Sequence, residues 1–102
     1  MLQEIKSLAK KYKEEFIAVR HHIHAHPELS YQEFETSKFI QTRLADMGIP
    51  YQVMATTGVV GLITGKEPSS RVIALRADMD ALPIEEQNDV PYKSTNKGVM
   101  HA

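Results

Sequence analysis

Two aspartates follow the most apolar run of the sequence. Asp78 and Asp80 stand two residues apart, directly after the segment RVIALRA at positions 71–77. In α/β sheets, ligands and reacting groups gather in the loops at the carboxyl ends of strands. Two carboxylates in such a loop can bind a divalent cation, or one of them can orient a metal-bound histidine. A structural role, in which Asp78 caps a turn and Asp80 is solvated, fits the same spacing.

Histidines form the second candidate group. Four of them lie within the segment RHHIHAHPE at positions 20–28. His22 and His26 are four residues apart, as two metal ligands are on one face of a helix. No glutamate follows the first of the two, however, and Pro27 disfavours the helical turn that would align them. The pattern therefore favours structural roles for these rings at a helix end.

The elements that must position these groups begin with a long helix. Apolar residues recur at steps of three and four from Leu2 to Ile23, which is the spacing of one helical face. Because proline disfavours helical geometry in the residue before it, the helix is predicted to end near His24, ahead of Pro27.

A second helix is predicted over residues 31–47. Ser30 as N-cap and Glu33 three residues later form a capping box, which is typical of a helix start. Gly48 stands where a left-handed residue would close the helix.

Extended structure is predicted after Gly48. Three segments rich in β-branched and apolar residues, 51–54, 59–64 and 71–77, are separated by Thr57-Gly58 and by the loop 65–70. The third is apolar at nearly every position from 72 to 75, which predicts burial on both faces, and 59–64 and 71–77 are predicted to pair as a hairpin. The fold class is therefore α/β, with two N-terminal helices followed by three strands.

The last stretch of the chain is polar and has no clear period. From Pro83 onward no helix or strand that could cover a sheet is predicted, so the α/β layer is incomplete. Within this stretch, the adjacent Glu85 and Glu86 are expected to be solvated, as glutamates in polar loops usually are.

Composition limits the possible functions. The chain has 102 residues, 42% of them hydrophobic and 25% charged, which is typical of one globular unit. Its net charge of −1 disfavours nucleic acid and anionic membranes as partners. No apolar run of membrane-spanning length and no secretory leader is present, which predicts a cytoplasmic protein, and the absence of cysteine excludes a thiolate metal site within these residues.

Taken together, four segments resemble a known family. They are IHAHPELSYQEFET at 23–36, TGVVG at 57–61, ALRADMDALPIEE at 74–86 and VPYKSTNKGVMHA at 90–102. In this order they are similar to the N-terminal part of the zinc-peptidase-like amidohydrolases, which include N-acyl-amino-acid amidohydrolase, hippurate hydrolase and the auxin-conjugate hydrolases. The resemblance implies that residues 1–102 are the start of a metallopeptidase-type catalytic domain. The lid domain and the metal-ligand segments of the family, beginning with Cys-Gly-His-Asp, are absent from these residues.

The activity implied by the resemblance is hydrolysis of the amide bond of an N-acyl amino acid or a related conjugate by metal-activated water. A divalent metal such as zinc or manganese is implied for the intact enzyme, with none bound by these residues alone. Asp80 matches the aspartate of the related H-x-D-x-x-P motif and is implied to orient a metal-bound group, and Asp78 stands at the histidine position of that motif. A small N-acyl amino acid substrate and a homo-oligomer are the implied partners.

Two alternatives to a catalytic role remain open on the sequence. The chain can be a non-catalytic remnant with an exposed apolar sheet edge, which would favour self-association. It can also be a small module that binds a metal through its histidines.

Overall fold

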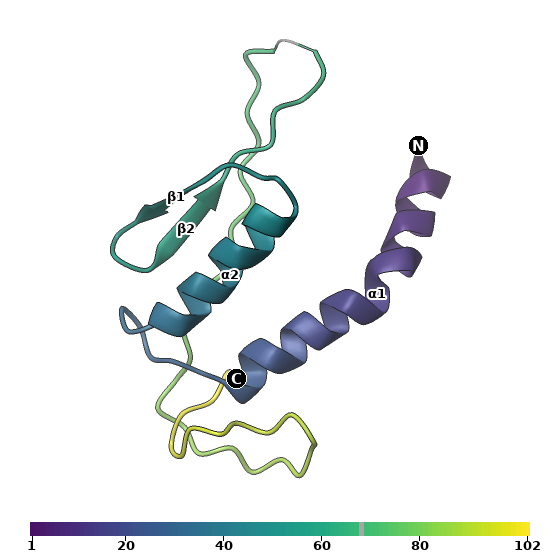
Figure 1. Ribbon diagram of the computed structural model, residues 1–102. Coiled ribbons are helices and arrows are strands. Elements are labelled where there is room, and N and C mark those ends of the chain that lie inside the picture. The colour runs from purple at the N-terminus through teal and green to yellow at the C-terminus, as the bar shows by residue number, and fades with distance from the viewer. Residues whose placement is uncertain (68) are drawn as a thin grey trace.

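The computed structural model describes residues 1–67 and 69–102, and it contains two helices and one two-stranded sheet within them. Position 68, within the predicted loop 65–70, lies outside the described residues. The radius of gyration is 16.0 Å, whereas a compact chain of this length has a radius of about 13 Å. The arrangement is correspondingly open: the N-terminal part of α1 extends away from α2 and the sheet (Figure 1), whereas its later turns contact α2 through the Glu15–Arg43 ion pair and the stacking of His22 on Phe39.

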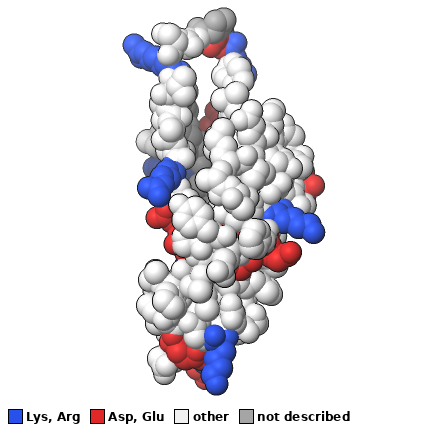
Figure 2. All heavy atoms as spheres, turned by 90° about the vertical axis from the view of Figure 1, so that its left-hand side faces the viewer, with Lys and Arg blue, Asp and Glu red and all other residues white. Residues whose placement is uncertain are grey.

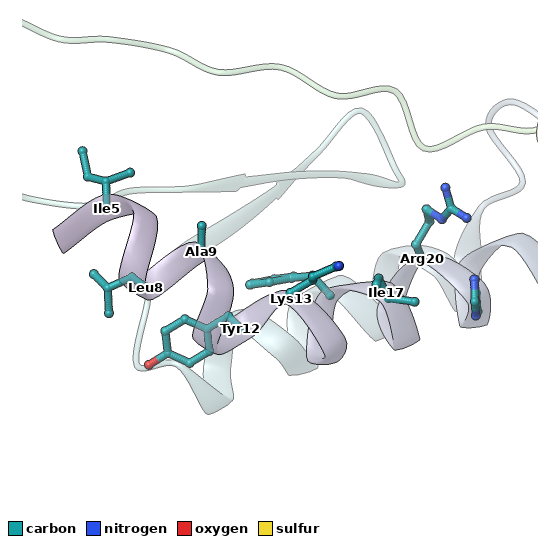
Figure 3. A pocket seen from close by; sticks show the side chains of 9 residues that line it. Ile5, Leu8, Ala9, Tyr12, Lys13, Ile17 and Arg20 are labelled. Atoms are coloured by element: carbon teal, nitrogen blue, oxygen red, sulfur yellow. The ribbon is translucent and has the colours of Figure 1, made fainter. Parts of the chain in front are cut away.

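Helix α1, Leu2–Ala25, confirms the first predicted helix and its end. The amide of His26 closes the last turn by donating to the carbonyl oxygen of Ile23, 3.2 Å away. The predicted apolar face forms but is largely exposed: none of the residues of α1 is buried, and only toward its end are residues of this face, Val19 and Ile23, half-buried. Side chains along α1, among them Ile5, Leu8 and Tyr12, line a surface pocket (Figure 3).

Helix α2, Phe34–Asp46, begins three residues later than predicted. The capping box was wrong, since neither Ser30 nor Glu33 caps the helix with its side chain. The cap is Glu28, whose carboxylate accepts the amides of Glu35 at 3.1 Å and Thr36 at 2.6 Å. Two amide donors at the start of the helix thus find their acceptor in Glu28, which lies six residues before Phe34 in the sequence. The negative charge of this carboxylate lies at the positive end of the helix dipole.

The end of α2 agrees with the sequence. Gly48 has φ +69°, its amide donates to Ala45, and the amide of Ile49 donates to Leu44, each at 2.9 Å. This pair of bonds is the Schellman arrangement, which needs a left-handed residue after the helix and so favours glycine.

Strands β1, Tyr51–Met54, and β2, Gly58–Gly61, form an antiparallel hairpin that packs on α2. The first predicted strand is confirmed and the second is confirmed over its first three residues, but the predicted partner was wrong, because β2 pairs with β1 and not with 71–77. A three-residue loop allows this pairing, with Ala55 and Thr56 both at positive φ. A Cβ atom on Gly58 would lie 2.8 Å from the carbonyl oxygen of Met54, so the close approach of the two strands requires glycine there.

Residues 71–77 do not form the predicted third strand. Val72, Ile73 and Leu75 are 86%, 89% and 96% exposed, so the predicted burial on both faces was also wrong. The segment has no β partner among the described residues. A β-strand depends on hydrogen bonds to a neighbour, and an apolar, β-branched sequence alone does not provide them.

The final stretch, 81–102, is irregular but closely hydrogen-bonded to the junction of the two helices. Ala81 donates to the carbonyl of Glu28 at 2.8 Å, and Thr95 donates its amide to the carbonyl of Ala25 at 2.9 Å. Among the described residues the buried apolar side chains gather here and are few: Pro27, Ala81 and Val99.

The surface is mixed in charge. On the face shown in Figure 2, basic and acidic side chains alternate along the molecule and uncharged residues cover much of the area between them. No helix in the described part of the chain combines the length and hydropathy needed to cross a membrane.

Replacement of Gly48 by alanine should lower the free energy of unfolding by about 1 kcal/mol, because a left-handed φ is costly for a residue with a Cβ atom. Space is not the cause, since nothing lies within 4 Å of the position that the added methyl group would take. Gly65→Ala is the matched control, because that site is equally open and has no positive φ. Urea unfolding followed by circular dichroism measures both, and equal effects of the two substitutions would contradict the assignment.

Replacement of Glu28 by alanine should lower the free energy of unfolding by about 1 kcal/mol through loss of the α2 cap. Glu14→Ala, on the exposed face of α1, should change it by less than about 0.5 kcal/mol. The same urea experiment tests this, and a Glu28 variant as stable as the Glu14 variant would show that the carboxylate does not cap the helix.

Candidate functional site

The two aspartates from the sequence lie in different surroundings. Asp78 is exposed, and its Oδ1 accepts a hydrogen bond from Nη2 of Arg76 at 2.9 Å, with that arginine also exposed. Asp80 is half-buried and lies next to the first residue of the irregular final stretch, Ala81. The structure therefore gives Asp80 a fixed environment and leaves Asp78 on the surface.

His101 is the neighbour of Asp80. Leu82 and Met100 exchange two backbone hydrogen bonds, of 2.9 and 3.0 Å, which bring the residues on either side of them together. Burial lowers the pKa of His101, nearby His24 lowers it further, and the carboxylate and backbone of Asp80 oppose these effects. The Nε2 atom of His101 is buried and makes no hydrogen bond within the described residues.

A buried carboxylate, Glu86, lies at the centre of the same region. Its oxygens accept the amide of Ser94 at 2.7 Å and Nδ2 of Asn88 at 3.1 Å, and both lie 3.0 Å from Nε2 of His24. The Ser94 amide and His24 are the chief causes that lower the pKa of Glu86 to about 2, against an opposing effect of burial. Glu86 is therefore ionised at neutral pH, and the expectation that it is solvated was wrong, since it is 3% exposed.

The other histidines make structural contacts. His26 bonds through Nδ1 to the carbonyl of His22 at 2.7 Å, and the His22 ring stacks on Phe39 at 4.3 Å between centroids. His21 stacks on Tyr92 at 3.7 Å. The four-residue spacing of His22 and His26 therefore allows a hydrogen bond at the end of α1.

The described residues do not fit a metal centre by themselves. No group of three or more His, Asp or Glu side chains within them is arranged to hold an ion. Asp80 and His101 offer two candidate groups at most, whereas a catalytic zinc site needs about three protein ligands. The histidine-module alternative therefore finds no site in this part of the chain.

Comparison with known proteins places this region in a family. Residues 74–102, which contain both aspartates, Glu86 and His101, match the model of peptidase family M20/M25/M40. The N-acyl-L-amino acid amidohydrolase of Geobacillus stearothermophilus is 46% identical over 101 residues, which are 98% of this chain and 27% of that protein. The chain is a member of the M20 family. Thermostable carboxypeptidase 2 of Saccharolobus solfataricus is also 46% identical, over all of this chain and 26% of that protein.

Two solved structures share the fold. A dinuclear metal-binding peptidase of the M20 family from Bacillus subtilis has a TM-score of 0.84 and 44% identity, covering 90% of this chain and 26% of that one. An aminohydrolase structure from methicillin-resistant Staphylococcus aureus, described as putative, has a TM-score of 0.92 and 36% identity, covering all of this chain and 27% of that one. The chain thus spans about a quarter of the length of its M20 relatives, and its fold matches the start of the M20 catalytic domain.

Glu86 is the residue that sequence reasoning missed. Glu85 and Glu86 stand side by side in the same polar stretch, and no local pattern distinguishes them. Two of the donors that bind Glu86 and not Glu85 lie far from it in the sequence: His24 is 62 residues upstream and Ser94 is 8 residues downstream. Only its place in the segment shared with the family could have drawn attention to it.

The stability that Glu86 contributes should depend on pH. Because its folded pKa lies below the ordinary value of 4.5, the contribution is full above about pH 4.5 and is lost as the pH falls toward 2. The difference in free energy of unfolding between the native protein and Glu86→Gln should therefore be largest above pH 5 and shrink as pH 2 is approached. Urea unfolding of both proteins across this range measures it, and a difference independent of pH would contradict the ionised, hydrogen-bonded carboxylate.

Proposed function

We propose that this M20 chain contributes to a metal-dependent hydrolase that cleaves the amide bond of N-acyl amino acids or related conjugates. The observation that carries the proposal is the placement of Asp80 beside His101 within the segment matched by the family model. The names of the relatives, an N-acyl-L-amino acid amidohydrolase and a carboxypeptidase, both denote amide hydrolysis. The metal and most of its ligands would come from outside the described residues, in a longer chain.

In this proposal the two aspartates have different roles. Asp80 directly precedes Ala81 and Leu82, whose amides donate to the carbonyls of Glu28 and Met100 and so hold this part of the backbone in place. Its half-buried carboxylate suits the orientation of a neighbouring imidazole or metal ligand. Asp78 is exposed and paired with Arg76, which suits electrostatic support at the rim of the site. Burial and the nearby His24 lower the pKa of His101, against an opposing effect of Asp80.

The test is an assay of the full-length protein that carries this chain. It should release free amino acid from N-acetyl or N-benzoyl amino acids and lose this activity when a chelator removes the metal. Asp80→Asn should lower kcat by about 10- to 100-fold, the scale on which activity falls when a residue that orients a metal ligand is lost. Asp78→Asn should have a smaller effect, and Asp89→Asn, which changes an exposed carboxylate of the same region, should have none.

Two results would count against the proposal. A folded, metal-loaded protein that releases no amino acid from a broad panel would leave the non-catalytic remnant as the better description. Full activity of the Asp80 variant would remove this residue from the site while leaving the amidohydrolase assignment in place.

A further inference from the structure

The Glu86 carboxylate joins the end of α1 to the final stretch of the chain. His24 comes from the end of α1, Asn88 and Ser94 come from the final stretch, and each contributes a nitrogen within 3.1 Å of a carboxylate oxygen. The side chain is 1% exposed, so water cannot replace these partners. An ionised carboxylate without such partners would be too costly to bury, and this cost favours the positions of the three donors around it.

From Ser94 the contacts continue toward Asp80. The hydroxyl of Ser94 donates to the carbonyl of Val99 at 2.7 Å, and its oxygen accepts the amide of Asn96 at 3.1 Å, which closes the turn between them. Val99 is buried and precedes Met100, which exchanges two backbone bonds with Leu82. Asp80, before Leu82, and His101, after Met100, lie on the same side of this antiparallel exchange, so the position of Ser94 bears on the register in which these two residues meet.

We propose that Glu86 is a positioning residue: by holding the Ser94 amide, it sets the place of residues 99–101 against Asp80. Among the described residues no hydrogen bond joins Glu86 to Asp80 or His101, and Glu86 acts through Ser94, Val99 and the Leu82–Met100 bridge. Its effect on the reaction rests on the proposed hydrolase function, whereas its effect on the position of the segment does not.

Other contacts confine the effect of Glu86 to this end of the chain. Thr95 and Asn96 bond to the carbonyls of Ala25 and Pro27, so the outer part of the turn has anchors of its own. The hairpin is linked to α2 through Thr57, whose hydroxyl donates to Glu33 at 2.7 Å, without participation of Glu86. Loss of Glu86 should therefore loosen the Leu82–Met100 bridge and leave the hairpin unchanged.

The first test measures amide hydrogen exchange in the full-length protein. Glu86→Leu, which keeps the approximate size and removes both acceptors, should accelerate exchange of the Leu82 and Met100 amides at least tenfold. The amide of Leu62, which donates to the carbonyl of Pro50 at the end of the hairpin, is the internal reference and should not change. Glu86→Gln should lie closer to the native protein, because its carbonyl oxygen can still accept the Ser94 amide, and Asp89→Asn should match the native protein.

The second test measures the kinetics of the same variants. Glu86→Leu should lower kcat at least tenfold with KM changed less than twofold, and Glu86→Gln should restore part of kcat. As a second route, His24→Gln retains an amide donor in place of Nε2 and should keep more activity than His24→Leu.

The outcomes separate the possibilities. Unchanged exchange at Leu82 and Met100 in Glu86→Leu would overturn the proposal, and so would equal acceleration at Leu62, because Glu86 would then only stabilise the fold as a whole. Accelerated local exchange with unchanged kcat would overturn the role in the reaction. A native protein without amidohydrolase activity would refute the proposed function alone, since the exchange data would still decide whether Glu86 positions the segment.

Discussion

A buried negative charge has to be matched by donors, and Glu86 meets this requirement with one donor from the end of α1 and two from the final stretch of the chain. The consequence is architectural. The end of α1, Asn88 and the turn at Ser94 are held where their nitrogens converge on one carboxylate. In a chain with few buried apolar side chains among its described residues, this polar centre determines local structure that a hydrophobic core would ordinarily determine.

A second glutamate performs a similar task at the other side of the junction. Glu28 caps α2 and, through its carbonyl, accepts the amide of Ala81. The segment HAHPE therefore works as one unit: His24 bonds to Glu86, His26 closes α1, Pro27 is fully buried and Glu28 starts α2. A motif that looks like a cluster of metal ligands serves to join two helices to the segment that carries Asp80.

The apolar surfaces show the opposite situation. The exposed face of α1 and residues 72–75 present large side chains to water, and each square ångström of such surface would gain about 25 cal/mol on burial. The matched parts of the solved M20 relatives are about a quarter of longer chains. We expect surfaces of this kind to be covered where the rest of such a chain is present, which also accounts for the β-like sequence of 71–77 without a β partner.

Local patterns were sufficient for the elements whose stabilising bonds are local. The two helices, the end of α2 at Gly48 and the strand at 51–54 follow from periodicity and from the conformational freedom of glycine, because their bonds join residues close in sequence. The family and the segment containing Asp78 and Asp80 also followed from the sequence, because family motifs are patterns of adjacent residues. The roles of the two aspartates in a reaction stay predictions.

Only the tertiary structure decided which residues meet across long separations. It showed that Glu28 and not Ser30 caps α2, that β2 pairs with β1, that 71–77 has no partner among the described residues, and that Glu86 is buried while Glu85 beside it is exposed. The physical reason is the same in each case. Whether a carboxylate is solvated or a strand is paired depends on donors and acceptors from elsewhere in the chain. The residues next to it in the sequence do not identify these partners.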